Sequence, residues 1–232
     1  MKLPRIPSAI VFDMDGLLFD TEALYQEAFD RAAADEGYEL PSALFLSMVG
    51  KGWPMNRVQM LEHYGQVFPV DRFRDAVRRY FGVMADARLR LKPGVIELLD
   101  TLDDLRMPRA IATSSAHSSV QHHLSAQGLV DRFHAVAAQG DYAAGKPAPD
   151  PFLKAAERLG VEARACLALE DSHAGVRSAS SAGMMTIMVP DLLEPTDEIR
   201  ALCTAVVPTL HEVRGLILAA QPVPLGCAWG RT

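Results

Sequence analysis

Two carboxylates stand two residues apart where the first apolar run of the chain ends. Residues 9–12 are apolar, and Asp13, Asp15 and Gly16 follow them. In open α/β sheets ligands bind beyond the carboxyl ends of the strands, so this is a favourable place for chemistry. Two crowded carboxylates repel each other, which favours a hard divalent cation such as Mg²⁺ as their partner. The alternative is a turn in which Asp and Gly serve only backbone geometry.

A group of hydroxyl side chains follows another apolar run. Thr113, Ser114 and Ser115 lie between residues 109–112 and a helical pattern. Free backbone N–H groups and the helix dipole favour an anion at such a position, so the segment is a candidate phosphate site. The alternative is ordinary N-capping of the helix by a serine.

One lysine lies in a loop that is stiffened by prolines. Lys146 belongs to the stretch 145–151, which contains three prolines. A lysine on a restrained loop can supply a fixed positive charge to a phosphoryl group and to a nearby carboxylate. The alternative is a lysine that is simply exposed to solvent.

Two adjacent acids follow a further apolar run. Glu170 and Asp171 come directly after residues 166–169. Acids at the end of a buried strand are costly unless they are solvated or bind a cation, so Asp171 is a candidate to complete a metal site. The alternative is N-capping of the next helix by Asp171 and Ser172.

The elements that would position these residues can be read from the hydrophobic pattern. Short apolar runs typical of buried parallel strands alternate with amphipathic helical stretches. The runs cover residues 9–12, 109–112, 135–137, 166–169, 186–189 and 205–207. All four candidate sites lie just after a run and before a helical stretch, so one sheet would bring them to one edge. A single active site is therefore favoured over four unrelated local features.

The fold predicted from this pattern is α/β, a Rossmann-like parallel sheet core with a helical cap inserted after the first strand. Residues 21–89 have helical spacing and no convincing strand, so we assign them to the cap domain. Residues 1–20 and 90–220 are assigned to the catalytic core. Residues 221–232 have no periodicity and contain two prolines, so we predict a loosely ordered tail.

Composition limits the classes of function. The chain has 232 residues, 49% of them hydrophobic, and a formal net charge of −6. This balance argues against a nucleic-acid partner bound through a broad basic surface. The three cysteines have no CxxC spacing, and no apolar stretch is long enough for a membrane span or signal peptide. We therefore expect a cytoplasmic protein without a membrane or nucleic-acid partner.

The order and spacing of the four motifs resemble the haloacid dehalogenase superfamily, and within it the capped phosphatases and mutases. The resemblance spans about residues 9–210. It implies that Asp13 is the nucleophile and Asp15 the general acid and base. Thr113 and the amide of Ser114 would bind phosphate, and Lys146 would be the bridging lysine. The resemblance further implies a Mg²⁺ site formed by Asp13, Asp171, the backbone carbonyl of Asp15 and, close by, Glu170.

The same resemblance separates reactions within the superfamily. Dehalogenases and phosphonate hydrolases lack an acid at the position of Asp15, so its presence favours phosphoryl transfer. In β-phosphoglucomutase-like proteins, a cap Lys-Gly pair is followed three residues later by an arginine that grips a second phosphate. Here Lys51 follows Gly50, and Trp53 stands where that arginine would be. The cap therefore favours a phosphatase, with a phosphosugar mutase as the alternative.

The expected substrate is a small phosphorylated metabolite, a sugar or nucleoside phosphate. The first motif and residues 49–51 also look like the group that contains pseudouridine-5′-phosphatase and sugar-phosphate phosphatases. A non-catalytic interaction protein on the same fold is a further alternative. It is disfavoured because Asp13, Asp15, Lys146 and Asp171 are all present.

Lys51, Trp53 and Asn56 are the residues of the cap segment that we expect to contact the substrate. We predict that Lys51→Ala alters KM or substrate preference far more than it alters metal binding. Steady-state kinetics over several phosphate esters, with metal titrations in parallel, would measure both. Unchanged kinetics on every accepted substrate would remove Lys51 from the site.

Overall fold

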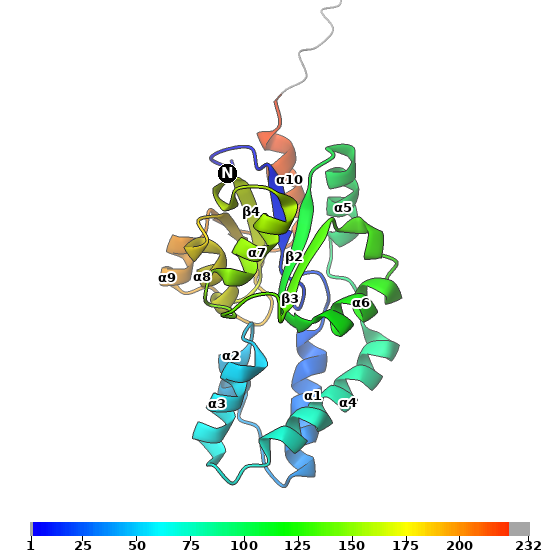
Figure 1. The fold of residues 1–232 in the computed structure, drawn as a ribbon, viewed down its shortest axis with the longest axis vertical. Helices are drawn as coiled ribbons and strands as arrows, with labels where there is room; N and C mark the ends of the chain where they lie inside the picture. Colours follow the sequence, from blue (N-terminus) through cyan, green and yellow to red (C-terminus); the bar gives the residue numbers. More distant parts are fainter. Residues whose placement is uncertain (1, 223–232) are drawn as a thin grey trace, which may run out of the picture.

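Residues 2–222 are described by a computed structural model, shown in Figure 1. Six strands form one parallel sheet in the order β3-β2-β1-β4-β5-β6. The strands are β1 (Ala9–Phe12), β2 (Arg109–Ala116), β3 (Ala135–Gln139), β4 (Cys166–Glu170), β5 (Met185–Met188) and β6 (Ala205–Val206). The predicted α/β fold is therefore confirmed. Most of the predicted tail, from residue 223 onward, lies outside the described residues.

The differences from the predicted strands are small and have a local cause. β2 continues four residues beyond its apolar run, to Ala116. Its pairing with β3 shifts register between Ala112 and Ala116, so the hydroxyl residues form an irregular end of the strand. β5 is displaced by one residue from the predicted run, and β6 is one residue shorter. Hydrophobic runs mark buried strands well, but they do not mark where hydrogen bonding ends.

The strand order places the candidate residues at a topological switch point of the sheet. β1 lies in the middle, with β2 on one side and β4 on the other. The chain fills the β2–β3 side first and then crosses to β4, so β1 and β4 flank a topological switch point. Ligands in open α/β sheets bind outside the carboxyl ends of the strands at such a point.

Helices cover both faces of the sheet, and the alternation of strand residues determines which helix each face contacts. Ile10 and Phe12 belong to the larger core, while Ala9 and Val11 face a smaller, alanine-rich one. The larger core holds residues of α5 (Val95–Asp104), α6 (His117–Ala126) and α10 (Leu210–Ala220). The smaller core holds residues of α7 (Asp150–Leu159) and α8 (His173–Ser181), and α9 (Asp197–Leu202) packs against α8. Small side chains let α7 approach the sheet closely.

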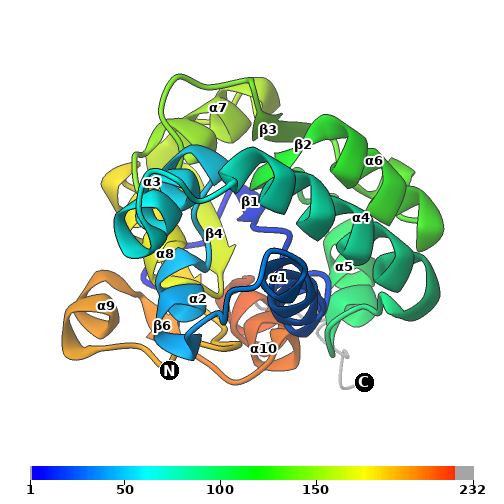
Figure 2. The same ribbon diagram turned by 90° about the horizontal axis from the view of Figure 1, so that it is seen from below.

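The stretch predicted to be helical between the first two strands contains four helices. They are α1 (Glu22–Asp35), α2 (Ser42–Met48), α3 (Trp53–Tyr64) and α4 (Val70–Arg88), and we refer to them as the cap helices. Figure 1 shows them as a separate layer below the sheet. Viewed from below in Figure 2, α1, α3 and α4 surround the lower ends of β1 and β4. The cap helices therefore cover the carboxyl edge of the sheet.

An aromatic cluster holds the cap helices together. Phe29 of α1 makes edge-to-face contacts with Phe45 of α2 and Phe73 of α4, with ring centroids 5.6 and 5.4 Å apart. Phe73, Val77 and Phe81 lie on the buried side of α4. Such pairs add to the stabilisation that burial of apolar area provides. The described part of the chain, residues 2–222, contains no helix with the length and apolar character that a bilayer crossing needs.

The two connections between the cap helices and the sheet run side by side. The backbone N–H of Asp20 donates to the carbonyl of Arg90 at 2.9 Å, and that of Lys92 donates to Leu18 at 3.0 Å. This short antiparallel contact begins only three residues after Asp15. The cap helices are therefore tied to the sheet beside the first motif.

Gly94, the N-cap residue of α5, offers a test of how α5 and α10 fit together. Its φ is +91°, and a Cβ there would lie 2.7 Å from the backbone nitrogen of His211 in α10. Gly128 also has positive φ, +66°, but a Cβ there would meet nothing within 4 Å. Gly128→Ala should cost about 1 kcal/mol of unfolding free energy through left-handed strain alone. Gly94→Ala should cost more than about 2 kcal/mol because α10 must also move.

Urea unfolding of both variants and the parent protein would measure these free energies. Gly128→Ala is the matched control because it shares the backbone strain without the close approach. Equal losses in the two variants would contradict the packing argument.

Candidate active site

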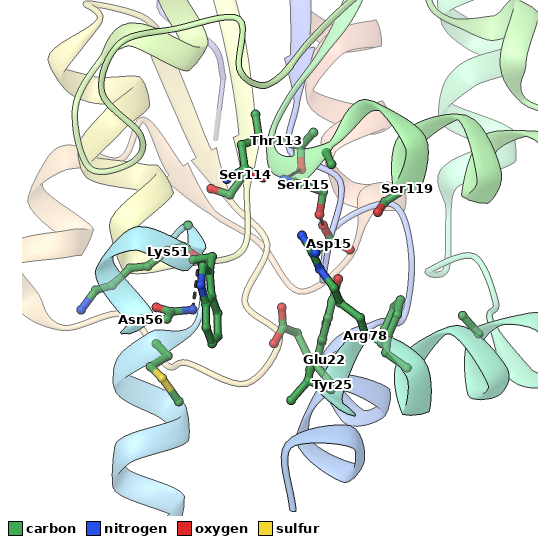
Figure 3. A pocket seen from close by; sticks show the side chains of 18 of the residues that line it. Asp15, Glu22, Tyr25, Lys51, Asn56, Arg78, Thr113, Ser114, Ser115 and Ser119 are labelled. Atoms are coloured by element: carbon green, nitrogen blue, oxygen red, sulfur yellow. Dashed lines mark hydrogen bonds between the residues drawn. The ribbon is translucent and has the colours of Figure 1, made fainter. Parts of the chain in front are cut away.

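A cavity of about 720 Å³ lies between the carboxyl edge of the sheet and the cap helices. Figure 3 shows side chains from both layers pointing into it. The cap reaches the core at Gly50, where a Cβ would lie 2.2 Å from Ser172 Oγ. Gly50 has a φ of +73°, so glycine suits both its conformation and this close contact. The loop between α2 and α3 therefore lies directly on the core.

One buried ammonium group joins two of the predicted motifs at the floor of the cavity. Lys146 Nζ donates to Asp13 Oδ1 and, at 2.5 Å, to Glu170 Oε1. The other oxygen of Glu170 accepts three hydrogen bonds, from the N–H groups of Asp171 and Ser172 and from Ser172 Oγ. Lys146 is only 1% exposed, and Glu170 is fully buried. Buried charges persist only when paired and hydrogen-bonded, so Glu170 anchors Lys146 against Asp13.

The floor of the cavity around Lys146 holds more carboxylate groups than ammonium groups. Carboxylate oxygens of Asp13, Glu170 and Asp171 lie within 4.8 Å of one another, beside the single ammonium of Lys146. Burial raises the pKa of Asp13 to about 8, with Glu170 and Asp15 adding to the effect and Lys146 opposing it. Burial and then Glu170 also raise the pKa of Asp171 well above its usual value. These oxygens therefore need a proton or a cation, and they are the donors that a hard divalent ion prefers.

The turn after Asp13 approaches this group because it contains a glycine. Gly16 has a φ of +84°, and a Cβ there would lie 2.3 Å from Asp171 Oδ2. Its N–H donates to Thr21 Oγ1 at 3.0 Å, which fixes the turn. Any other residue would be strained and would also displace the Asp171 carboxylate.

Asp15 is held from the end of β2. Ser115 Oγ donates to Asp15 Oδ2 at 2.7 Å, and the Ser115 N–H donates to Thr113 Oγ1 at 3.0 Å. The second oxygen, Asp15 Oδ1, is buried and has no hydrogen-bond partner among the described residues. Asp15 is therefore oriented through one oxygen, while its other oxygen has no partner within residues 2–222.

The hydroxyl segment does not cap the helix that follows it. The N-cap position of α6 is Ala116, without a side-chain cap. Ser114 Oγ is buried and unpartnered within the described residues, and the carbonyl of Thr113 accepts from Tyr142 OH at 2.8 Å. A buried hydroxyl without a partner is unfavourable unless a ligand supplies one. The capping alternative is thus wrong for this segment, and the Ser114 hydroxyl is the one that has no partner among residues 2–222.

In the fourth motif, Ser172 caps the next helix and Asp171 does not. Ser172 caps α8, because its Oγ accepts from the Gly175 N–H at 3.1 Å. Asp171 does not cap the helix and instead faces Asp13. The capping alternative is therefore correct for Ser172 and wrong for Asp171, and the role of Asp171 as a metal ligand stays a prediction.

The cap residues named from the sequence line the cavity, but their side chains differ in direction. Lys51, Trp53 and Asn56 all contribute to the lining. In Figure 3 the Lys51 side chain extends away from Asp15 and Thr113. Asn56 Nδ2 donates to the Lys51 carbonyl at 3.4 Å, so Asn56 supports the loop backbone. The structure thus places Lys51 at the cavity without directing its ammonium at the acids.

The cavity is also lined by residues that were not identified from the sequence as site residues, among them Glu22, Tyr25, Arg74 and Arg78. Glu22 is buried, and burial followed by the charge of Asp15 raises its pKa to about 8. Its position at the end of the first motif could have indicated that it lies near the site. The two arginines are four residues apart on α4, beside its apolar face. Helical spacing could have placed them on one face, but not against the cavity.

Comparison with known proteins places this site in a family. Residues 7–183 match the family model described as haloacid dehalogenase-like hydrolase. The matched region contains all four motifs and extends over more than half of the chain. The chain therefore belongs to the haloacid dehalogenase-like hydrolases.

Individual relatives agree with this assignment. A probable pseudouridine-5′-phosphatase of Drosophila melanogaster is 35% identical over 82% of this chain and 84% of the relative. A phosphorylated carbohydrates phosphatase of Thermotoga maritima is 31% identical over 77% of this chain and 83% of the relative. CbbY from Rhodobacter sphaeroides, solved in complex with phosphate, superposes with a TM-score of 0.77 at 25% identity, covering 89% of this chain and 96% of that one. The predicted enzyme class, a phosphoric monoester hydrolase of this family, is confirmed.

The charge balance at the floor of the cavity predicts how stability depends on pH. The pKa values of Asp13 and Glu22 are about 8 in the folded protein, whereas unfolded carboxyls ionise near about 4. The folded protein therefore binds more protons than the unfolded chain between these values. Without divalent cations, the free energy of unfolding should fall as pH rises from about 5 to about 8, by at least about 1.4 kcal/mol.

Denaturant unfolding in a chelator across this pH range would measure the fall. Asp171→Asn removes one of the crowded carboxylates and should make it smaller, and so should an added divalent cation. Asp104→Asn, at an exposed position of α5, is the control and should leave the slope unchanged. If the free energy of unfolding depends on pH equally in Asp171→Asn and the parent protein, crowding of the carboxylates is not the cause.

Proposed function

We propose that the protein is a Mg²⁺-dependent phosphatase that hydrolyses a small phosphate monoester through an aspartyl phosphate on Asp13. One observation carries the proposal: a buried Asp13 carboxylate is fixed by Lys146 beside Asp15, whose buried Oδ1 has no hydrogen-bond partner among the described residues. A structural ion pair would not require that unpartnered oxygen. Together the two acids offer a nucleophile and a proton donor at one place.

In the first step an oxygen of Asp13 attacks phosphorus as the bond from phosphorus to the ester oxygen breaks. Asp15 gives its proton to the departing oxygen, so the alcohol leaves neutral. The Lys146 ammonium offsets the added negative charge, and Thr113 and the Ser114 amide are the proposed donors to the phosphoryl oxygens. Asp13 must be ionised to attack. Its pairing with Lys146 favours that form against the effect of burial.

In the second step the phosphoryl group passes from Asp13 to water. Asp15, now ionised, accepts a proton from the water as its oxygen bonds to phosphorus, and the bond to Asp13 breaks. Inorganic phosphate leaves and Asp15 is again protonated. The hydrogen bond from Ser115 keeps Asp15 in one orientation through both steps.

The residues that would hold Mg²⁺ are Asp13, Asp171 and the backbone carbonyl of Asp15. A bound ion supplies charge stabilisation to the phosphoryl oxygens, which is a common role of metal ions in phosphoryl transfer. Glu170 would stand outside this set, because its oxygens already accept from Lys146 and from three other donors. Its role in the proposal is to keep Lys146 in place.

A sugar or nucleoside phosphate is the proposed substrate class. The cavity of about 720 Å³ falls within the usual size of small-molecule sites, about 300–1,000 Å³. The relatives named above are phosphatases of pseudouridine 5′-phosphate and of phosphorylated carbohydrates. Those names favour hydrolysis over the mutase reaction. A cytoplasmic location and the absence of nucleic-acid or membrane partners stay predictions.

The helical segment 21–89 is proposed to act as a cap. The contact of its loop at Gly50 with Ser172, the residue after Asp171, supports this proposal. Closure would exclude water while Asp13 is being phosphorylated. The paired connections near residues 18–20 and 90–92 are the proposed hinges.

The proposal predicts distinct losses at the two acids. Asp13→Asn removes the nucleophile and should lower kcat at least about 1,000-fold on every substrate. Asp15→Asn removes the proton donor and should lower kcat about 100- to 10,000-fold, least for esters with good leaving groups. Phosphate release from sugar and nucleoside monophosphates, with Mg²⁺ or with a chelator, would measure these effects.

The screen should include β-glucose 1-phosphate with a bisphosphate primer. A product isomer in place of free phosphate would establish the mutase reaction instead. Full activity of Asp13→Asn, or equal rates in Mg²⁺ and chelator, would overturn the proposed mechanism.

A further inference from the structure

Helix α6 of the core presents two polar side chains to the cavity. Ser119 and His123 are four residues apart, so they lie on the same face of the helix, and both line the cavity. In Figure 3 the Ser119 side chain extends from α6 into the same space as Asp15 and Arg78. Neither residue belongs to the four motifs, and the mechanism proposed above uses neither of them.

His123 lies beside the turn that carries Asp15. Its ring makes an edge contact with Phe19, with the ring centroids 5.6 Å apart, and a tilted contact with Phe81 of α4 at 5.7 Å. The carbonyl of Phe19 accepts from the Gly16 N–H at 2.9 Å and so closes the turn. His123 is therefore a core residue that stands between the turn of the proposed proton donor and the cap.

A histidine is an unfavourable residue at this position if its only role is packing. His123 is only 2% exposed, and its Nδ1 is buried without a hydrogen-bond partner among the described residues. The aromatic rings of Phe19 and Phe81 offer it no hydrogen bond. An apolar side chain would fill the same space without leaving a polar atom unpaired. The imidazole therefore needs a further reason, and a ligand in the cavity would supply one.

The enclosed nitrogen also indicates which nitrogen can serve a ligand. Burial lowers the pKa of His123, with the charge of Asp15 opposing it, so the ring is neutral near pH 7 and carries one N–H. Buried donors without a partner are rarer in proteins than buried acceptors without one. The proton therefore belongs on Nε2, which is not enclosed as Nδ1 is. His123 thus offers one N–H donor to the cavity that it lines.

The two other residues of α6 that line the cavity differ from this pair. His122 and Ser118 are exposed to solvent, and His122 Nε2 is bonded to Asp86 Oδ1 of α4 at 2.8 Å. Ser119 is half-buried and His123 is buried. The pair that remains for a ligand is therefore Ser119 Oγ and His123 Nε2, one helical turn apart.

We propose that His123, together with Ser119, determines specificity by binding a hydroxyl group of the alcohol that leaves. The inference rests on the proposed function and deepens it, because it names the kind of alcohol. With the phosphoryl group beside Asp13 and Thr113, the ester oxygen lies at Asp15 and the alcohol continues along α6. His123 Nε2 donates to a hydroxyl oxygen there, and Ser119 Oγ accepts a hydroxyl proton. Esters of polyhydroxylated alcohols are then preferred to esters without hydroxyl groups.

Esters with and without hydroxyl groups test this inference. The hydroxylated probes are ribose 5-phosphate, glucose 6-phosphate and uridine 5′-monophosphate, which also separate free sugars from nucleosides. The probes without hydroxyl groups are butyl phosphate and p-nitrophenyl phosphate. His123→Phe keeps an aromatic ring but removes the donor. It should lower kcat/KM about 10- to 100-fold on the preferred hydroxylated ester and less than about threefold on p-nitrophenyl phosphate. Ser119→Ala should act in the same direction, by about 3- to 10-fold.

Gln121→Ala is the matched control, because Gln121 is exposed on α6, donates to Ser125 Oγ at 3.0 Å and does not line the cavity. It should leave kcat/KM unchanged on every ester. His123→Gln restores an N–H donor at the position of the ring and should recover part of the loss. Thermal unfolding of each variant separates a folding defect from a binding defect.

Three outcomes would overturn the inference. If His123→Phe lowers kcat/KM equally on sugar phosphates and p-nitrophenyl phosphate, the histidine positions Phe19 and the turn of Asp15 and binds no hydroxyl group. If kcat/KM is unchanged on every ester, the histidine does not contact the substrate. If the parent protein hydrolyses butyl phosphate as well as the sugar phosphates, no hydroxyl site is needed. In each case hydrolysis that is lost in Asp13→Asn would leave the proposed phosphatase standing, so the two proposals fail separately.

Discussion

The structure depends on one buried ammonium group shared by two carboxylates. Lys146 joins Asp13 at the end of β1 to Glu170 at the end of β4, and Glu170 is itself fixed by the start of α8. An isolated lysine at this depth would be expelled or neutralised. Its burial therefore requires both strands in register, and the register is what brings Asp171 beside Asp13.

The same interaction explains why the cavity has two electrostatic halves. The floor carries three carboxylates and one ammonium, so it favours added positive charge. The cap side carries Arg74 and Arg78, which favour added negative charge. The acids of the floor are positioned by the sheet, whereas the two arginines are positioned by helix α4 of the cap.

Much of the floor of the cavity could be predicted from the sequence, and particular residues show why. Asp13, Thr113, Lys146 and Asp171 follow apolar runs or a proline-stiffened loop, and parallel strands bring such positions together whatever the details. Which residue would cap a helix was not predictable. Ser172 caps α8 whereas the similar Ser114 leaves its hydroxyl unpartnered, because the irregular end of β2 places Ala116 at the N-cap of α6.

The sequence by itself determined the α/β core, the family and the acids of the floor, because hydrophobic periodicity and motif spacing specify strand ends. Only the tertiary structure decided which cations of the cap line the cavity. Trp53 stands where the mutases have an arginine, yet Arg74 of α4 lies over its ring, and Arg78 reaches toward Asp15. The direction of α4 depends on aromatic packing against α1, where Phe73 contacts Phe29 and Phe81 stacks on Tyr25, and no spacing along the chain encodes that orientation.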